Sequence, residues 1–302
     1  MANNLRIVYN NHINLPTTLL TASAVSSANA TTANLKGDVK SLVFRSSTAG
    51  IQINTKSIII VDLAQVRDFN CVILPFTNLT ATATVLVRGH ASLPTTSSAS
   101  PPVLSGGGAT TTLFNGLVCP WALNGLPDWN PLINTAAGYS YGKGNHAAAW
   151  LPSTGSFRYL SIEVTDTSQS TRIIEISKLV VGMYWEPTYN TNFGVSHSME
   201  DMSEHERSES GNLLTNRGPR YRTLQFDLSY LDASDKQEFT RFMIANGTFM
   251  PLFISVFPNN GNTSALLEQE RSHMLYGKLV STPSLKYFAP QVYSTSLEVE
   301  EI

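Results

Sequence analysis

The chain has 302 residues, which suffices for one large domain or two domains of ordinary size. Only 14% of the residues are charged and the formal net charge is -2, so the sequence lacks the basic field of a nucleic-acid-binding protein. Because no apolar run approaches about 18 residues, we expect no membrane span. Residues 1–4 carry neither a basic nor an apolar segment, so we expect no secretory signal.

The first half of the chain predicts a β-sandwich. Short runs of β-branched residues alternate there with turn residues, as is typical of sandwich strands. Residues 16–40 and 91–112 have little periodicity and are expected to be loops, while residues 119–152 read as an irregular aromatic insertion. The expected strands are residues 6–9, 42–45, 50–53, 56–63, 70–74, 84–89, 157–164 and 172–182.

The second half predicts a smaller β-rich unit that begins after Pro187, which ends the preceding strand. Residues 196–211 are acidic and are expected to form an exposed loop or arm that reaches solvent or a neighbouring subunit. Residues 221–230 alternate cleanly, which places Leu224, Phe226 and Leu228 on a core face. Further strands are expected at residues 251–256, 276–280 and 292–300.

One helix is predicted between residues 234 and 246. Ser234 and Gln237 have the spacing of a capping box. Phe239, Phe242 and Met243 form one apolar stripe, and Gly247 follows as a stop signal.

The two cysteines are expected to be structural. Cys71 lies in a predicted strand where a small apolar side chain fits, and Cys119 is the only other cysteine. Two cysteines cannot build a disulfide framework, and no CxxC pair is available for a metal. Synthesis in the cytoplasm is the simplest expectation.

An early strand of residues 1–186 carries Val61-Asp62-Leu63, and a closing segment carries Ile174-Glu175-Ile176 followed by Val181-Gly182. With these motifs, residues 1–186 resemble the galactose-binding-like jelly roll. This resemblance implies an all-β fold with a jelly-roll β-sandwich first, facing outward or binding carbohydrate.

Residues 187–302 have the order strand, capped helix, residues 251–255, a polar loop, residues 276–279 and a final Glu-rich strand. In this order they resemble structural proteins of tailed-bacteriophage tails, in particular the distal tail or tail-tip proteins. The resemblance implies a β-barrel-like assembly module in a minor tail protein located in the virion. The implied partners are other tail proteins and further copies of this chain, in a ring of three or six around the tail axis.

The aromatic insertion supplies candidates for contact with a host-surface glycan. Trp and Tyr cover the apolar faces of a pyranose, while Asp and His bind its hydroxyl groups. The alternative is that these aromatics anchor a long loop or fill a subunit interface, where Trp and Tyr are also enriched. The candidate residues are Trp121, Asp128, Trp129, Tyr139, Tyr141, His146 and Trp150.

Other chemistry finds little support in the sequence. One cluster has side chains of metal-binding types but lacks a metal-site spacing, so a solvated acidic segment is expected: His197, Glu200, Asp201, Glu204, His205 and Glu206. No GxSxG elbow is present, and no carboxylate pair stands out for glycoside hydrolysis. We therefore expect no cofactor, no metal and no enzyme.

These observations favour a structural subunit of a phage tail tip or baseplate. Its final strand, residues 297–299, is expected to lie at a sheet edge that pairs with a neighbouring subunit. The alternative function is a carbohydrate-binding adhesin without a role in a ring. A glycoside hydrolase that uses the sandwich as an accessory is the third alternative, and the 116 residues after the sandwich leave little room for its catalytic domain.

Overall fold

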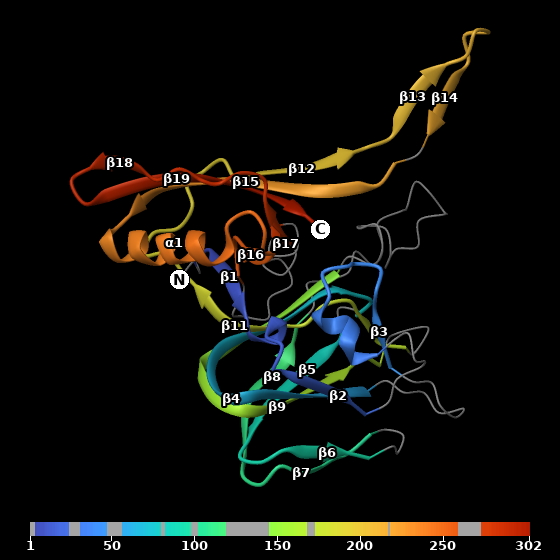
Figure 1. Cartoon of the computed structure of the whole chain (residues 1–302), viewed down its shortest axis with the longest axis vertical. Helices are drawn as coiled ribbons and strands as arrows, with labels where there is room; N and C mark the ends of the chain where they lie inside the picture. The colour runs from blue at the N-terminus through green and yellow to red at the C-terminus, as the bar shows by residue number, and fades with distance from the viewer. Residues whose placement is uncertain are drawn as a thin grey trace.

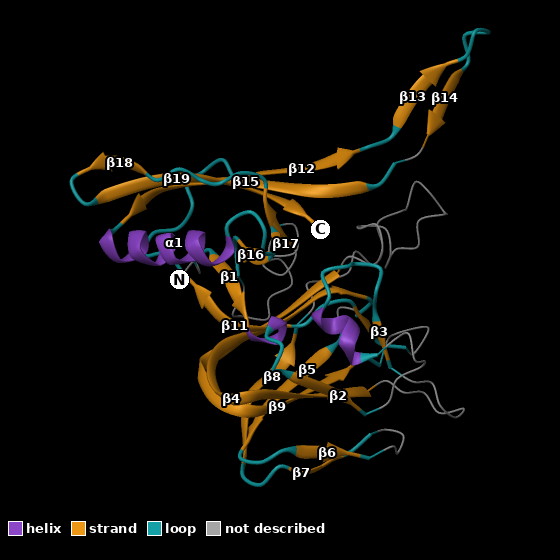
Figure 2. Cartoon of the chain, viewed as in Figure 1, coloured by secondary structure: helices purple, strands orange, loops and turns teal. Residues whose placement is uncertain are grey.

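The fold is known from a computed structural model. It describes residues 4–23, 31–46, 56–79, 82–97, 102–118, 145–167, 173–216, 218–258 and 273–302. Two β-rich units lie one above the other, and a thin two-stranded extension projects from the upper unit (Figure 1). Strands dominate both units, and one α-helix of four turns lies between the upper sheet and the sandwich below (Figure 2). The predicted fold class, an all-β chain with a sandwich first and a smaller β unit with one helix second, is confirmed.

The sandwich unit is built mainly from two long strands that pair along most of their length. β4 (Lys56–Thr77) and β9 (Asn145–Thr165) are antiparallel, and their register shifts between Asp62 and Arg67. The remaining elements are β2 (Leu19–Ala22), β3 (Phe44–Arg45), β5 (Thr84–His90), β6 (Pro94–Thr96), β7 (Leu104–Gly106), β8 (Thr110–Leu117), β10 (Glu175–Ile176), β11 (Val180–Trp185), and the 3-10 helices η1 (His12–Asn14) and η2 (Thr32–Lys36).

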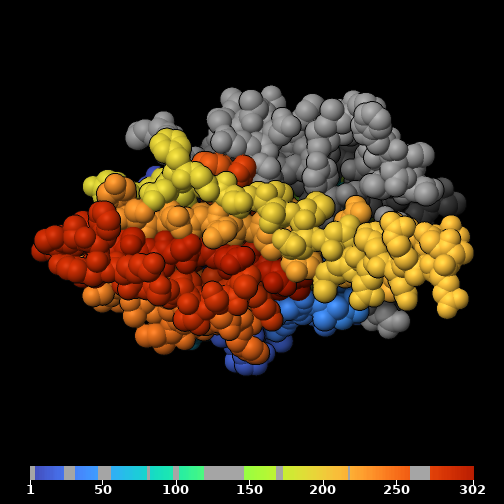
Figure 3. Space-filling model, turned by 90° about the horizontal axis from the view of Figure 1, so that it is seen from above, coloured from blue at the N-terminus to red at the C-terminus, as the bar shows by residue number. Residues whose placement is uncertain are grey.

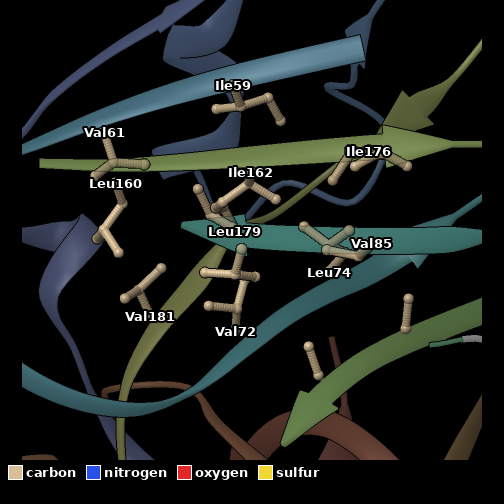
Figure 4. Close-up of a cluster of buried hydrophobic side chains, with 14 of the residues drawn as sticks. Ile59, Val61, Val72, Leu74, Val85, Leu160, Ile162, Ile176, Leu179 and Val181 are labelled. Atoms are coloured by element: carbon tan, nitrogen blue, oxygen red, sulfur yellow. The ribbon is translucent and has the colours of Figure 1, made fainter. Parts of the chain in front are cut away.

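A bend in the long strands lets them contribute to both layers of the sandwich. Ala64 adopts a φ of 65° in the exposed stretch between the two paired halves of β4. The first half of β4 pairs with β2, and the second half pairs with β11. Ile59 and Val61 from one layer therefore meet Val72 and Leu74 from the other in one buried apolar core (Figure 4). This core is the largest of the three in the described chain.

The upper unit packs one face of a sheet against α1 (Ala233–Asn246). Leu224, Phe226 and Leu228 are buried with Phe239 and Phe242 of the helix, so the predicted core faces of both elements are confirmed. The other elements are β12 (Ser196–Asp201), β13 (Glu204–Arg207), β14 (Leu213–Asn216), β15 (Arg220–Leu231), β16 (Leu252–Ser255), β17 (Met274–Leu279), β18 (Lys286–Ala289) and β19 (Val292–Glu301).

The first strand, β1 (Arg6–Asn11), belongs to both units. One of its edges pairs with β11 of the sandwich and the other pairs with β16 of the upper unit. A single hydrogen-bonded order therefore runs β12-β15-β19-β17-β16-β1-β11-β4-β9-β5-β8. Leu5 and Ile7 are buried in the upper core, although the sequence division at residue 186 assigns them to the sandwich.

The cap of α1 differs from the sequence prediction. Asp232, not Ser234, is the N-cap residue, and its carboxylate accepts a hydrogen bond from the backbone N–H of Asp235. The Ser234 hydroxyl donates to the same carboxylate. A carboxylate satisfies a free backbone donor of the first turn at least as well as a hydroxyl does. The predicted stop is confirmed, since Gly247 has a φ of 50° at the C-terminal end.

Three further expectations are wrong in detail. The expected loop at residues 16–40 contains β2 and η2, and the expected loop at residues 91–112 contains β6, β7 and the start of β8. The final strand is not an edge, because β19 pairs with β15 on one side and with β17 on the other. The expected strand at residues 50–53 lies outside the described residues.

Candidate functional site

Two of the seven predicted glycan-binding residues lie in the described chain, and both are buried. Trp121, Asp128, Trp129, Tyr139 and Tyr141 lie outside the described residues, so their part in glycan binding stays a prediction. His146 and Trp150 belong to β9, where they face away from the sandwich core and toward the upper unit. Their surroundings match the alternative stated above, in which these side chains pack within the protein instead of binding a glycan.

Trp150 is part of an aromatic and cationic stack. Its ring is 6% exposed and meets Tyr184 edge-on, with the ring centroids 5.5 Å apart. Phe253 of β16 lies 6.3 Å away on the side of the upper unit. The Arg6 guanidinium lies 5.0 Å from the Trp150 ring centroid and is held by Glu186 at 3.1 Å. Trp150 thus contacts both units through β1 and β16. We call this region, where the sandwich and the upper unit meet, the joint.

His146 is enclosed by charged groups at the same joint. Arg222 of β15 lies with its Nη2 2.8 Å from Nε2 of His146 and 2.9 Å from a carboxylate oxygen of Glu301. Lys40 approaches that carboxylate at 3.7 Å. The ring of His146 also packs edge-on against Phe253. We call these charged groups, His146, Arg222, Glu301 and Lys40, the joint network.

Electrostatics keeps His146 neutral. Arg222 only donates hydrogen bonds, so Nε2 of His146 must accept and the ring proton lies on Nδ1. Burial, with the nearby charges of Arg222 and Lys40, holds the pKa of His146 well below its ordinary value of 6.5. Burial also lowers the pKa of Lys40, against the opposing effect of Glu301.

A second buried cation locks the sandwich loops to the joint. The Lys178 ammonium is 1% exposed and donates to Asp38, to Asn14 Oδ1 and to the Lys36 carbonyl oxygen. Tyr276 of the upper unit donates to the same Asp38 carboxylate at 3.2 Å. Because the Lys178 ammonium and the Tyr276 hydroxyl both have hydrogen-bond acceptors, we interpret this cluster as structural.

The one cysteine of the described chain is inert, as predicted. Cys71 is fully buried in the joint, and burial raises the pKa of its thiol to about 12. Its thiol donates to the Gly182 carbonyl oxygen at 3.2 Å. Such a thiol stays protonated and unreactive at neutral pH.

An open depression lies beside Trp150. It has a volume of about 630 Å³ and is lined by β8, by residues 150–152 and by Tyr184. β8 ends the hydrogen-bonded order of the sheet, so one of its edges carries free backbone groups among the described strands. Phe114 contributes an apolar side chain to the lining of the depression, and Asn115 contributes a polar one.

The most exposed ordered feature is an arm, which we define as β12, β13 and β14 with the part of β15 that pairs with β12. All residues of β12, β13 and β14 are exposed. Asp201 and Arg220 pair across the arm at 2.7 Å, and Ser203 with Arg220 lowers the pKa of Asp201 to about 2. The arm projects beyond the body of the molecule (Figures 1 and 3). It corresponds to the acidic segment predicted at residues 196–211, now seen as strands.

Metal and membrane chemistry find no support in the described part of the chain. His197 and His205 lie in different strands of the arm, and no group of three metal-binding side chains gathers anywhere in the described ranges. Across those same ranges, no helix has the length and apolar character required to span a bilayer.

Sequence reasoning missed the joint network. Arg222 and Glu301 both continue the core-facing alternation of their strands, in step with Leu224 and Val299, but a charged side chain is not expected in a core. The alternation therefore signalled their burial, whereas their partners His146 and Lys40 come from far along the chain and no local pattern announces them. Glu298 and Glu300 differ from Glu301 in the structure, because only Glu301 is buried.

No family model matches the sequence, and no curated protein matches it. Several solved structures are similar to part of the chain. A GH29 fucosidase from Ruminococcus gnavus in complex with fucose is 14% identical with a TM-score of 0.37, over 59% of this chain and 27% of that one. The family 32 CBM from Clostridium perfringens NanJ, in complex with galactose, is 10% identical with a TM-score of 0.37, over 59% and 99%.

A chitosan-binding module from Paenibacillus sp. IK-5 is 14% identical with a TM-score of 0.36, over 57% of this chain and 98% of that one. This chain therefore spans about a quarter of the fucosidase and nearly all of the two small modules. Likenesses of this size place no binding residue and no activity on this chain.

Proposed function

We propose that the chain is a structural subunit that assembles through protein–protein contacts made by its arm. The observation that carries the proposal is the complete exposure of β12, β13 and β14. A two-stranded ribbon alone is at best marginally stable in water, and ordering its backbone costs about 1–2 kcal/mol per residue. A ribbon without packing partners gains its stability when another protein covers it.

The apolar side chains of the arm support this proposal. Met199, Met202, Leu213 and Leu214 are between 48% and 59% exposed. Exposed apolar side chains on a projecting element suit a surface that a partner covers.

We place this subunit in the tail tip or baseplate of a tailed phage, in the virion. The support is the sequence resemblance of residues 187–302 and the projecting arm, which suits a ring-forming subunit. Its partners would be further copies of the chain, in a closed ring of three or six, and other tail proteins. Assembly by surface complementarity requires no turnover, so no enzymatic step is proposed.

The test is the mass of the chain in solution, measured by light scattering over a wide range of concentrations. A matched variant replaces residues 203–218 with an Asn-Gly turn between Met202 and Pro219, whose backbones are already hydrogen-bonded. We expect the full chain to exceed the mass of one copy and the trimmed variant to remain a single copy. A single copy for both would contradict the proposal.

Carbohydrate binding by the sandwich is the second candidate. Two observations favour it: the density of Trp and Tyr in residues 121–150 of the sequence, and the depression lined by β8 and Trp150. The family 32 CBM in complex with galactose and the chitosan-binding module show which ligand classes to try first. In this reading the protein is an adhesin, with or without a ring.

The test is retention on immobilised galactosides and chitosan oligomers, extended to a glycan array. Trp129→Ala should abolish retention while thermal unfolding stays unchanged. Phe193→Ala is the control, since this fully exposed aromatic lies far from the insertion in sequence. Equal retention of both variants would rule out a role for Trp129.

A further inference from the structure

The upper unit carries a second exposed apolar surface at the end opposite the arm. Tyr189, Tyr230, Tyr287 and Phe288 are between 57% and 72% exposed. We call these four residues the aromatic end. All four lie at one end of the sheet: Tyr287 and Phe288 belong to β18, whose partner Tyr293 pairs with Leu231, and Tyr230 directly precedes Leu231 and packs on Tyr189. Tyr230 points to the opposite face of the sheet from Tyr287, so the aromatic end includes both faces of this end.

The aromatic end is ordered rather than frayed. Tyr189 and Tyr230 pack edge-on at 6.3 Å, and Tyr287 packs against Tyr293 at 5.5 Å. These exposed aromatics, of which two contact each other and a third is held by Tyr293, have the composition of an interface centre, where Tyr and other large aromatics carry much of the binding energy. Such a surface needs a partner with apolar side chains.

The arm and the aromatic end cannot meet within one chain. β18 and β19 turn at one extreme of the upper sheet, whereas β13 and β14 lie at the other extreme (Figure 3). Each copy therefore presents one arm and one aromatic end, and both remain uncovered in the single chain. A contact between two different surfaces of identical copies is head-to-tail and repeats.

Charge and backbone groups favour this pairing. The register of the arm tip places Glu204, Glu206 and Leu214 on one face. The segment around β18 carries Lys286 and has no acidic residue from position 280 to position 297. β18 also pairs with β19 alone among the described strands, so its outer edge is open to an added strand.

We infer that the arm of one copy docks on the aromatic end of the next copy of the same chain. This inference rests on the proposed function and names the surface that receives the arm. The methionines and leucines of the arm would contact the aromatic rings, while Glu204 and Glu206 would lie near Lys286. The repeat of this contact builds a closed ring, or an open filament if the rotation does not close.

The experiment uses full chains and light scattering, with thermal unfolding to confirm that each variant folds. The double variant Tyr287→Ser/Phe288→Ser should weaken self-association by at least about 30-fold, because interface aromatics each account for about 1 kcal/mol or more. Ile244→Ser is the matched control, since this residue is 82% exposed on α1 and outside both surfaces. It should associate like the unaltered chain.

A mixing experiment then tests the direction of the contact. The arm-trimmed chain keeps its aromatic end, and the Tyr287→Ser/Phe288→Ser chain keeps its arm. Each alone should be a single copy, and the two mixed should form a 1:1 dimer that grows no further. Lys286→Glu should weaken this dimer because it faces Glu204 and Glu206.

The outcomes separate this inference from the proposed function. If the aromatic-end variant associates as well as the unaltered chain while the trimmed chain does not, the inference fails and arm-driven assembly stands. If the two variants fail to pair when mixed, the head-to-tail direction is wrong. If the unaltered chain remains a single copy at every concentration, both proposals fail.

Discussion

The joint between the two units and the arm use the same residue types in opposite ways. At the joint, Arg222 and Glu301 are buried and form a charge pair at 2.9 Å. In the arm, Arg220 and Asp201 form a pair of similar geometry at 2.7 Å that is exposed to water. The two arginines lie two residues apart on β15, so one strand carries both environments.

The difference shows which of the two regions stabilises the fold. Water screens the Arg220–Asp201 pair, and exposed pairs of this kind contribute about 0–1 kcal/mol. Arg222 has lost its hydration, so it depends on Glu301 and on the neutral ring of His146. The joint holds the two units as one body, whereas the arm is free to serve a partner.

The largest expected effect comes from breaking the joint network. Arg222→Ala should lower the free energy of unfolding by about 3–5 kcal/mol, because it leaves the Glu301 carboxylate buried with only Lys40, at 3.7 Å, to offset its charge. Urea denaturation of the purified chain measures the loss. Arg220→Ala is the matched control and should change stability by less than about 1 kcal/mol. Equal losses for the two arginines would contradict the contrast between joint and arm.

Trp150→Ala should have an effect of similar size for a different reason. Removal of a buried aromatic that packs against Tyr184 and Phe253 leaves a cavity and should cost about 3–5 kcal/mol. Phe193→Ala removes an exposed aromatic and should cost less than about 0.5 kcal/mol. If Trp150→Ala kept its stability yet lost retention on a glycan, the ring would serve the depression rather than the joint.

His146 predicts a pH dependence that originates at the joint. The folded state holds the pKa of His146 well below 6.5, so the unfolded chain binds a proton that the folded chain rejects. Stability from this group is complete above pH 6.5 and is lost as the pH falls, at about 1.4 kcal/mol per pH unit in the affected window. Urea denaturation at a series of pH values measures the slope.

His146→Gln removes this contribution, because a neutral amide oxygen accepts the hydrogen bond from Arg222 without titrating. Below pH 6.5, the pH dependence of the free energy of unfolding should fall by the equivalent of about one proton taken up on unfolding. The remaining dependence comes from His12, His90 and His197, whose pKa values burial also lowers. His205→Gln controls for the loss of an exposed histidine in the arm. An unchanged slope in His146→Gln would show that water reaches the joint.

The sequence predicted what local patterns determine. Alternation in β15 and the Phe stripe of α1 gave the upper core, and β-branched runs gave the sandwich strands. The pattern did not reveal that β4 passes through both layers, because the bend at Ala64 uses an exposed turn-like stretch inside one hydrogen-bonded strand. It also did not reveal β1 as the shared strand, since pairing with β16 spans most of the chain length.

The candidate site was harder to predict because aromatic residues serve both sugar binding and packing. Trp150 and His146 were chosen by type, and only the upper unit lying against β9 shows that they are enclosed. The arm was predicted as exposed, which is confirmed, but its strands were not, because its polar residues show no apolar alternation.

The smallest effect on stability should come from the arm. The variant that replaces residues 203–218 with an Asn-Gly turn removes β13 and β14, which pack against no buried cluster. Its free energy of unfolding should therefore match that of the full chain within about 0.5 kcal/mol, measured by urea denaturation where both are single copies. The ends are already paired at Met202 and Pro219, so the turn closes a register that exists.

The trimmed variant separates the contribution of the arm to folding from its contribution to assembly. If the arm serves a partner, its removal leaves stability intact and abolishes association, whereas Arg222→Ala lowers stability first and affects association only through unfolding. A loss of more than about 2 kcal/mol on trimming would mean that the arm contributes to the fold of its own chain. The joint and the arm would then belong to one cooperative unit, and the exposed strands would stabilise their own chain instead of serving a partner.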